Sequence, residues 1–109
     1  KRIETTLCKA KELKRHADKL ISLAKKDTLQ ARRRVKAKLM LRHNKLTPKE
    51  KKQVHAGNKK SYNDDRNILE ELFGELKQRY TSRQGGYTRL IHTRNRLGDN
   101  AQKVLIEYI

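Results

Sequence analysis

Six apolar side chains between residues 68 and 80 place the strongest constraint on how this chain can fold. They recur at the three- and four-residue spacing of one helical face, and they are Ile68, Leu69, Leu72, Phe73, Leu76 and Tyr80. Asp64 and Asp65 precede them, where negative charge stabilises a helix N-terminus. The pattern predicts an amphipathic helix over about residues 65–80, with Phe73 in the core.

Two further helices are indicated upstream. Between about Lys9 and Lys26 the apolar residues fall on one helical stripe, which comprises Leu13, Ala17, Leu20, Ile21 and Ala24. Asp27 followed by Gln30 fits an N-cap with its capping-box partner, so we expect the second helix to begin at Asp27. The buried edge of that helix is predicted at Ala31, Val35 and Leu39.

The two ends of the chain are predicted to form strands. Residues 2–7 alternate in polarity, and residues 87–94 and 103–109 are rich in β-branched and aromatic side chains. In the last segment, Val104, Ile106 and Tyr108 alternate with Lys103, Leu105 and Glu107, so one face can pack on helices while the other stays in solvent. The turn residues Gly98, Asp99 and Asn100 join the last two segments into a hairpin. We therefore predict a single α+β domain over residues 1–109, in two layers. A three-stranded sheet, built from the N-terminal strand and the C-terminal hairpin, is covered by about three helices.

The predicted helix at 65–80 runs directly into an arginine–glycine stretch, residues 79–96, with five arginines around a glycine pair and no lysine or acidic residue. Arginine grips phosphate in two places, and glycine leaves room for a sugar-phosphate backbone beside the main chain. An ordinary turn would explain the glycines alone. With the arginines included, the stretch predicts contact with a polyanion. The candidate residues are Arg79, Arg83, Gly85, Gly86, Tyr87, Thr88, Arg89, Arg94 and Arg96.

The charge balance makes nucleic acid the expected partner. Lys and Arg number 29 against 12 Asp and Glu, a formal net charge of +17 that repels itself unless a polyanion lies alongside. More candidates lie at the N-terminus and on the charged faces of the first two helices. Such faces are ordinarily just solvated, and an arginine in the block at 32–34 can instead cover the edge of the core. These candidates are Lys1, Arg2, Lys9, Lys11, Lys14, Arg15, Arg32, Arg33 and Arg34.

Residues 42–64 differ from the segments on either side. Thr47-Pro48-Lys49-Glu50 is a capping box with proline at the first helical position, which predicts a short helix from Pro48 to about Ala56, closed by Gly57. Val54 is its one apolar anchor. We interpret the segment as a cationic excursion that buries little surface.

No residue pattern points to catalysis, a metal site or a cofactor. The sequence has no zinc-ligand spacing of His and Cys, no phosphate-binding loop that ends in Gly-Lys-Ser/Thr, and no Gly-x-Ser-x-Gly elbow. Glu71 and Glu75 share a predicted helix face, which solvation explains better than metal binding. Cys8 is interpreted as structural. We therefore expect no enzyme activity and no small-molecule substrate. We also expect no membrane partner, since no apolar run approaches the ~20 residues of a membrane span.

Three blocks of sequence, in this order, resemble one family. The first is I-E-T-T-L-C-K-A-K-E-L-K-R from Ile3, and the second is A-K-K-D-T-L-Q-A-R-R-R from Ala24. The third is S-R-Q-G-G-Y-T-R-L from Ser82, followed by R-N-R-L-G-D-N-A-Q and a short apolar tail. Together they resemble the bacterial large-subunit ribosomal protein seventeen family.

The resemblance implies a structural protein of the large ribosomal subunit that binds large-subunit ribosomal RNA. It implies a place near the polypeptide exit tunnel, beside neighbouring ribosomal proteins, in the bacterial cytoplasm or in an organelle. It does not extend over residues 42–64, which we interpret as an insertion, and it implies a basic native segment before Lys1. The leading alternative is a nucleoid-type DNA-binding protein, although no convincing helix-turn-helix is visible. A third possibility is a protein that binds anionic membranes, but the chain lacks the aromatic residues expected on an interfacial helix.

Overall fold

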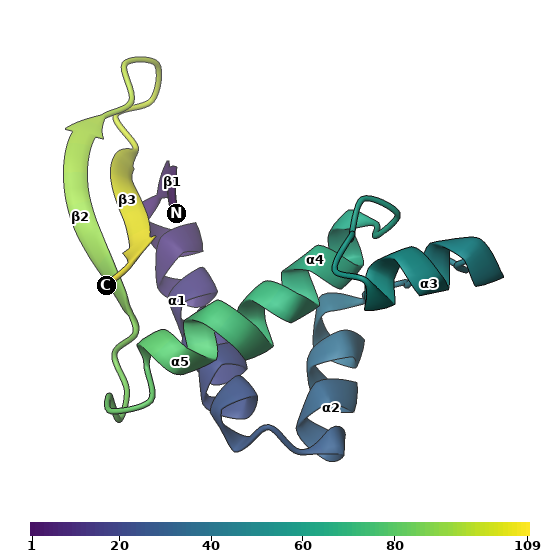
Figure 1. Ribbon diagram of the computed structural model, residues 1–109. Coiled ribbons are helices and arrows are strands. Elements are labelled where there is room, and N and C mark those ends of the chain that lie inside the picture. The colour runs from purple at the N-terminus through teal and green to yellow at the C-terminus, as the bar shows by residue number, and fades with distance from the viewer.

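The sheet is built from the two ends of the chain (Figure 1). The computed structural model describes all 109 residues, and its strands are β1 (Arg2–Thr6), β2 (Thr88–Asn95) and β3 (Gln102–Tyr108). Both pairings are antiparallel, and the order is β1-β3-β2, so the last strand of the chain is the central one. The predicted N-terminal strand and C-terminal hairpin are therefore confirmed.

One face of the sheet is covered by α1 (Leu7–Lys26), which follows β1 without a loop. Val104 and Ile106 of β3 are buried beneath this helix, and Ala10 and Ala17 are buried on the side of the helix that faces the sheet. The residues that alternate with them in β3 remain partly exposed on the opposite face of the sheet. The sheet thus has one packed face and one open face, as the alternation in the sequence predicted.

Two further helical elements pack on α1 rather than directly on the sheet. They are α2 (Leu29–Leu39) and a continuous rod formed by α4 (Asp64–Glu71), η1 (Leu72–Leu76) and α5 (Lys77–Arg79), which crosses α1 (Figure 1). The buried side chains between them are Ile21, Ala24, Val35, Leu72, Phe73, Tyr80 and Tyr87. The predicted helix at 65–80 and the core position of Phe73 are confirmed.

A π-helical turn interrupts the rod at η1, which the sequence pattern did not predict. In a regular α-helix, successive side chains point about 100° apart, so two neighbours that both enter the core lie towards opposite edges of its buried face. Leu72 and Phe73 are adjacent and both buried, with exposed fractions of 5% and 7%. The wider turn lies where this pair enters the core, and Gly74 within it has no side chain to pack.

Two sequence predictions about α2 are wrong. The N-cap is Thr28, whose hydroxyl accepts a hydrogen bond from the Ala31 amide at 3.1 Å. Asp27 instead ends α1 in the left-handed conformation, with φ 45°, and the two adjacent residues are both of a type that caps helices. Leu39 was predicted to be buried but is 36% exposed, because the core contact of α2 ends after Ala31 and Val35.

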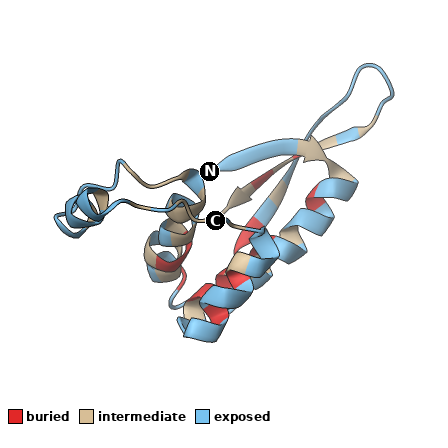
Figure 2. Ribbon diagram, turned by 90° about the vertical axis from the view of Figure 1, so that its right-hand side faces the viewer, coloured by how far each residue is buried: buried red, intermediate tan, exposed pale blue.

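Residues 42–64 form an arm that projects from the helical body (Figure 1). It contains α3 (Pro48–His55), which begins at the predicted capping box of Thr47 and Glu50. No residue between 36 and 71 is buried, and Figure 2 shows the buried positions confined to the sheet and the helical body. The radius of gyration is 17.0 Å, against about 13 Å for a compact domain of this length.

Asp27 links three helical elements through its two carboxylate oxygens. Oδ1 accepts a hydrogen bond from Arg32 at 2.8 Å, and Oδ2 accepts one from Lys77 at 2.7 Å. The bond from Lys77 and then the bond from Arg32 hold the pKa of the carboxyl below its ordinary value of 3.8. The carboxylate therefore joins the end of α1 to α2 and to α5.

We predict that Asp27→Asn lowers the melting temperature at pH 7 by a few degrees, while asparagine still tolerates the left-handed backbone. Because the pKa of Asp27 is lower in the folded state, its ionised carboxylate stabilises the fold above the pKa of the unfolded state. This contribution is lost as the pH falls through the pKa of the folded state. The difference between the two proteins should therefore shrink below pH 3.8. Glu75→Gln is the control, because Glu75 is exposed and forms no ion pair. A difference that does not shrink as the pH falls would contradict the charge bridge.

Candidate nucleic-acid interface

The loop between α5 and β2 carries the predicted glycine pair and is fixed to the core. The Lys25 ammonium donates a hydrogen bond to the Arg83 carbonyl at 2.5 Å and lies 5.7 Å from the centre of the Tyr87 ring. Gly85 and Gly86 have φ of 142° and 59°, which would strain a residue with a side chain. No other part of the protein comes within 4 Å of where their β-carbons would lie. The loop is thus held from inside and open outside.

Tyr87 and Thr88 were predicted to contact a polyanion, and the structure places both side chains in the interior. Each is 3% exposed. The Tyr87 ring packs against Tyr80 with 5.2 Å between centroids, and the Thr88 hydroxyl donates to Asp18 Oδ1 at 3.0 Å. The prediction is therefore corrected for these two side chains. They close the core where the loop enters β2.

Two arginines of the stretch border this loop. Arg83 Nε donates a hydrogen bond to the Gly85 carbonyl at 3.1 Å, which orders the side chain across the turn. The Arg79 guanidinium lies 5.7 Å from the centre of the Tyr80 ring. Both side chains are exposed, and neither forms an ion pair. The structure therefore places Arg83 against the glycine pair, while Arg79 lies at the end of α5, where the loop begins.

The other three arginines of the stretch lie along the hairpin, away from the loop. Arg89 projects from the open face of the sheet and pairs with Glu107 of β3 at 2.6 Å. Arg96 pairs with Asp99 in the hairpin turn, and Arg94 is exposed without an ion pair. The stretch contains no acidic residue of its own, but Glu107 and Asp99 partly neutralise it after folding.

Lys11, Lys14 and Arg15 form a cationic face of α1, and Lys9 lies on another side of the helix, since two residues are about 200° of turn. Lys9 and Lys11 are exposed and Lys14 is partly exposed, and none of these three forms an ion pair. Arg15 lies 3.7 Å from Glu12 one turn earlier, a spacing that contributes little in solvent. This face is therefore available to an anion.

The arginine block of α2 divides as its two readings allowed. The Arg32 guanidinium pairs with Asp27 and lies 4.6 Å from the centre of the Phe73 ring, so this residue covers the edge of the core. Arg33 and Arg34 point outward and form no ion pair. Only these two remain available as contacts from the block.

The candidates at the start of β1 lie at the edge of the sheet. Lys1 pairs with Glu71 of α4, and this hydrogen bond raises the pKa of the lysine above its ordinary value of 10.5. Arg2 is exposed and lies opposite Glu107 in the register of β1 and β3. Glu107 is thus flanked by Arg2 on one neighbouring strand and by Arg89 on the other.

A hollow between α1 and α2 brings together cations that the sequence did not single out. This α1–α2 hollow has a volume of about 300 Å³ and is lined by Lys19, Ser22, Leu23, Lys26, Arg34 and Lys38. Of these, only Arg34 was predicted as a contact. The signal was present in the seven-residue spacing of Lys19 and Lys26 on one helix face, but it becomes a site only once α2 folds back alongside.

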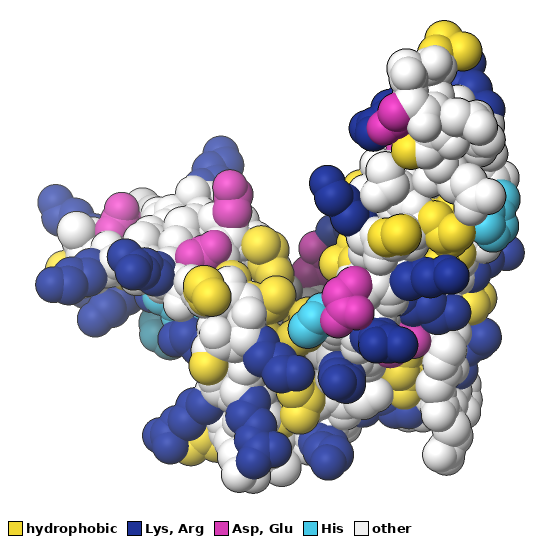
Figure 3. Space-filling view, turned by 180° about the vertical axis from the view of Figure 1, so that it is seen from behind, with side chains coloured by type: hydrophobic (Ala, Val, Ile, Leu, Met, Phe, Trp, Pro, Cys, Tyr) yellow, Lys and Arg dark blue, Asp and Glu magenta, His cyan; other side chains and the backbone are white.

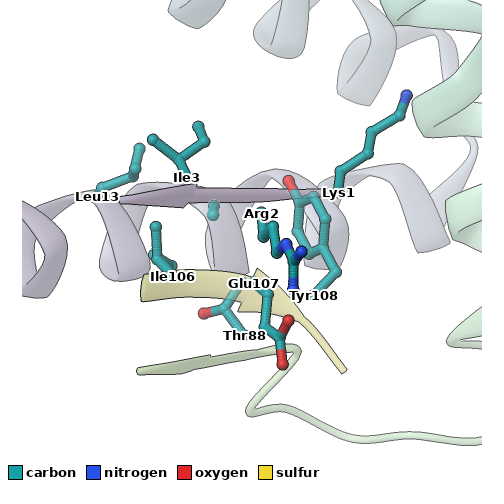
Figure 4. Close-up of a pocket in the computed structure, with 9 residues that line it drawn as sticks. Lys1, Arg2, Ile3, Leu13, Thr88, Ile106, Glu107 and Tyr108 are labelled. Carbon is teal, nitrogen blue, oxygen red and sulfur yellow. The ribbon is translucent and has the colours of Figure 1, made fainter. Parts of the chain in front are cut away.

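A second hollow, of about 350 Å³, lies between β1, β3 and α1, and its lining is mainly apolar (Figure 4). The side chains of Ile3 and Leu13 lie next to each other at its rim, with exposed fractions of 60% and 40%. Ile106 and Tyr108 of β3 also line it. Its chemistry suits an apolar group rather than phosphate.

The arm is held at its base by polar contacts instead of a core. Arg66 of α4 donates to the side-chain and main-chain oxygens of Asn44 at 2.9 and 2.8 Å. Asn63 donates to the Arg42 carbonyl at 2.6 Å. Burial, and then the nearby Lys36 and Arg66, hold the pKa of His43 below its ordinary value of 6.5, so the ring is neutral at neutral pH. The base is ordered, while the lysines of α3 remain exposed.

These observations define a class of protein. Figure 3 shows Lys and Arg side chains spread over the helical body and along the arm, with no acidic side chain among those at the bottom of the view, over α1 and α2. No group of three or more His, Cys, Asp or Glu residues is placed to hold a metal ion. None of the helices has the length and apolar character required to cross a membrane. The chain is a small basic α+β protein whose candidate site is a cationic surface.

Comparison with known proteins then gives the family. A family model described as Ribosomal protein L17 matches residues 1–109. The large ribosomal subunit protein bL17 of Chlamydia abortus is 58% identical over 108 residues, which cover 99% of this chain and 76% of that protein. The protein of the same name in Chlamydia felis is 59% identical, with the same coverage. The chain belongs to the ribosomal protein L17 family.

Family membership confirms the resemblance inferred from the sequence. It identifies a structural ribosomal protein and not an enzyme. The family match includes residues 42–64, and the interpretation of this segment as an insertion stays a prediction, as does the single-domain boundary. The individual contact residues also stay predictions, except for the corrected side chains of Tyr87 and Thr88.

We predict that Glu107→Gln strengthens binding to a polyanion, because it releases Arg89 and removes the negative charge opposite Arg2. On a poly(A)·poly(U) duplex, the dependence of log K on log salt should steepen by about 1, as expected for one more neutralised phosphate. Filter binding over a salt series measures this slope. Glu75→Gln removes the same charge from an exposed residue without an ion pair, and an equal change in both variants would show that net charge alone is responsible.

Proposed function

We propose that this chain is a structural constituent of the bacterial-type large ribosomal subunit, in the cytoplasm, and that it binds large-subunit ribosomal RNA and stabilises its folded form. The observation that carries the proposal is membership of the ribosomal protein L17 family, whose relatives in Chlamydia are named large-subunit proteins. The net charge of +17 on a chain with few buried residues supports the same conclusion. A place near the polypeptide exit tunnel, beside other ribosomal proteins, is the finer part of this proposal and rests on the family resemblance.

The mechanism is bridging between RNA segments. Unpaired cations project from several parts of the body, including the loop at Arg83, the face of α1 at Lys11 and the outward side of α2 at Arg33. Each neutralises phosphates on the RNA that lies against it, and release of condensed counterions supplies much of the affinity. RNA segments that would repel one another are then held on one small protein frame.

Fractionation of a cell lysate on a sucrose gradient tests the assignment to the large subunit. The protein should comigrate with the large ribosomal subunit and leave it at high salt, since its attachment is mainly electrostatic. A lysate treated with a nuclease that cleaves only DNA is the control for trapping by DNA. Comigration with the nucleoid would instead support the DNA-binding alternative and overturn the proposal.

We predict that the preorganised arginines contribute more to RNA binding than the lysines of the arm. Arg83 is ordered by its bond to Gly85, and Arg89 projects from the backbone of β2, so both extend from a rigid frame and less freedom is lost on binding. Replacing Arg83 and Arg89 by alanine should weaken binding to purified large-subunit RNA by on the order of 1–3 kcal/mol more than replacing Lys51 and Lys52.

Filter binding at matched salt measures both pairs, and circular dichroism confirms that each variant is folded. The pairs are matched because each removes two positive charges. Equal losses would mean that the total charge, and not the arginine–glycine stretch, sets the affinity.

A further inference from the structure

The α1–α2 hollow is an exposed cleft whose cations have no internal partner. Lys19, Lys26, Arg34 and Lys38 line it, together with Ser22 and Leu23, and no acidic residue contributes to the lining. None of the four cations forms an ion pair. Like charges that surround a hollow with a partly apolar wall attract an anion more strongly than the same charges on a flat surface.

The contrast with other cations in this protein is informative. Arg32 and Lys77 share Asp27, Arg89 pairs with Glu107, and Arg96 pairs with Asp99, so these groups already have a counter-charge. The chain has only 12 acidic residues, and the α1–α2 hollow receives none of them. Its charge is therefore compensated only from outside.

The dimensions fit a phosphate backbone. Lys19 and Lys26 are seven residues apart on α1, which places them about 10 Å apart along the helix axis at 1.5 Å per residue. Arg34 and Lys38 are one helical turn apart on α2, about 6 Å along the axis. Cations on both walls thus extend over a length that holds two or three consecutive phosphates of one strand.

The side-chain types favour the backbone of RNA over its bases. Three of the four cations are lysines, which bind phosphate as point charges and do not read sequence. No aromatic residue lines the α1–α2 hollow, so it has no platform on which a base can stack. Leu23 adds an apolar patch against which a sugar can rest.

The last turn of α1 separates this hollow from the arginine–glycine loop. Lys25 points to the loop, where it binds the Arg83 carbonyl, whereas Lys26 lines the hollow. Successive side chains on a helix diverge by about 100°, so these two lysines serve different sides of the same helix. The two cationic sites are therefore distinct.

We propose that the α1–α2 hollow is a second phosphate-binding site, which holds the sugar-phosphate backbone of structured RNA through Lys19, Lys26, Arg34 and Lys38 without sequence preference. The proposal rests on the proposed function, namely that this chain binds large-subunit RNA. It adds a site on the other side of α1 from the arginine–glycine loop, so one protein contacts two RNA segments across a single helix.

The test compares Lys26→Gln/Arg34→Gln with Lys51→Gln/Lys52→Gln. Both pairs remove two charges from exposed positions, and circular dichroism confirms folding. The probe is purified large-subunit ribosomal RNA in filter binding over a salt series. The pair in the α1–α2 hollow should lose about tenfold in affinity at physiological salt, and its log–log salt slope should fall by about 1–2. The pair on α3 should lose less than about threefold. The charge-retaining variant Lys26→Arg/Arg34→Lys should bind like the wild type.

Each contrary outcome has its own meaning. Equal losses and equal slopes for the two glutamine pairs would overturn the second site while leaving the proposed function intact. Failure of the wild type to bind this RNA would overturn the proposed function and the second site together. If the pair in the α1–α2 hollow bound RNA like the wild type but lost binding to poly-glutamate, the hollow would be a site for an acidic protein instead.

Discussion

Repulsion among 29 basic side chains is the constraint under which the whole fold is built. Only 13 residues are buried, and the main apolar cluster has seven members. Burial of apolar side chains therefore contributes little stabilising free energy against that repulsion. Carboxylates therefore lie where cations of different elements meet. Asp27 joins α1 to α2 and α5, Glu71 receives Lys1, and Glu107 lies between the outer strands. Residues 42–64 lie beyond these contacts and project from the helical body without a buried residue.

The elements marked by regular apolar spacing were predicted correctly from the sequence. Helical spacing identified the helix at 65–80 and its core residue Phe73, and the alternation in residues 103–108 identified the buried face of β3. The capping box at Thr47 placed α3 because its hydrogen bonds are local. The N-cap was predicted at Asp27 but lies at Thr28, since both residues are of capping types and Asp27 instead ends α1 and binds Arg32 and Lys77. The π turn left no periodic signal, and strand order depends on contacts distant in sequence.

The candidate site was less predictable than the fold, because charge alone does not say what a cation will meet. Tyr87 was predicted to contact a polyanion, yet its side chain fills the core beside Tyr80. The arginines at 89 and 96 sit in an acid-free stretch of sequence and acquire acidic neighbours through the hairpin. Conversely, the α1–α2 hollow assembles from lysines that are unremarkable in the linear sequence. Folding thus neutralises some cations and concentrates others.

The central position of β3 also has a consequence for the order of events during synthesis. Each of the other strands pairs only with β3, and β1 at residues 2–6 is joined to residues 103–107. Pairing over nearly the full chain length carries a high entropic cost of loop closure and is slow. A chain emerging from the ribosome can form α1 and the helical rod early, whereas β1 and β2 have no partner strand until β3 appears. The sheet is therefore completed only after β3 has been synthesised.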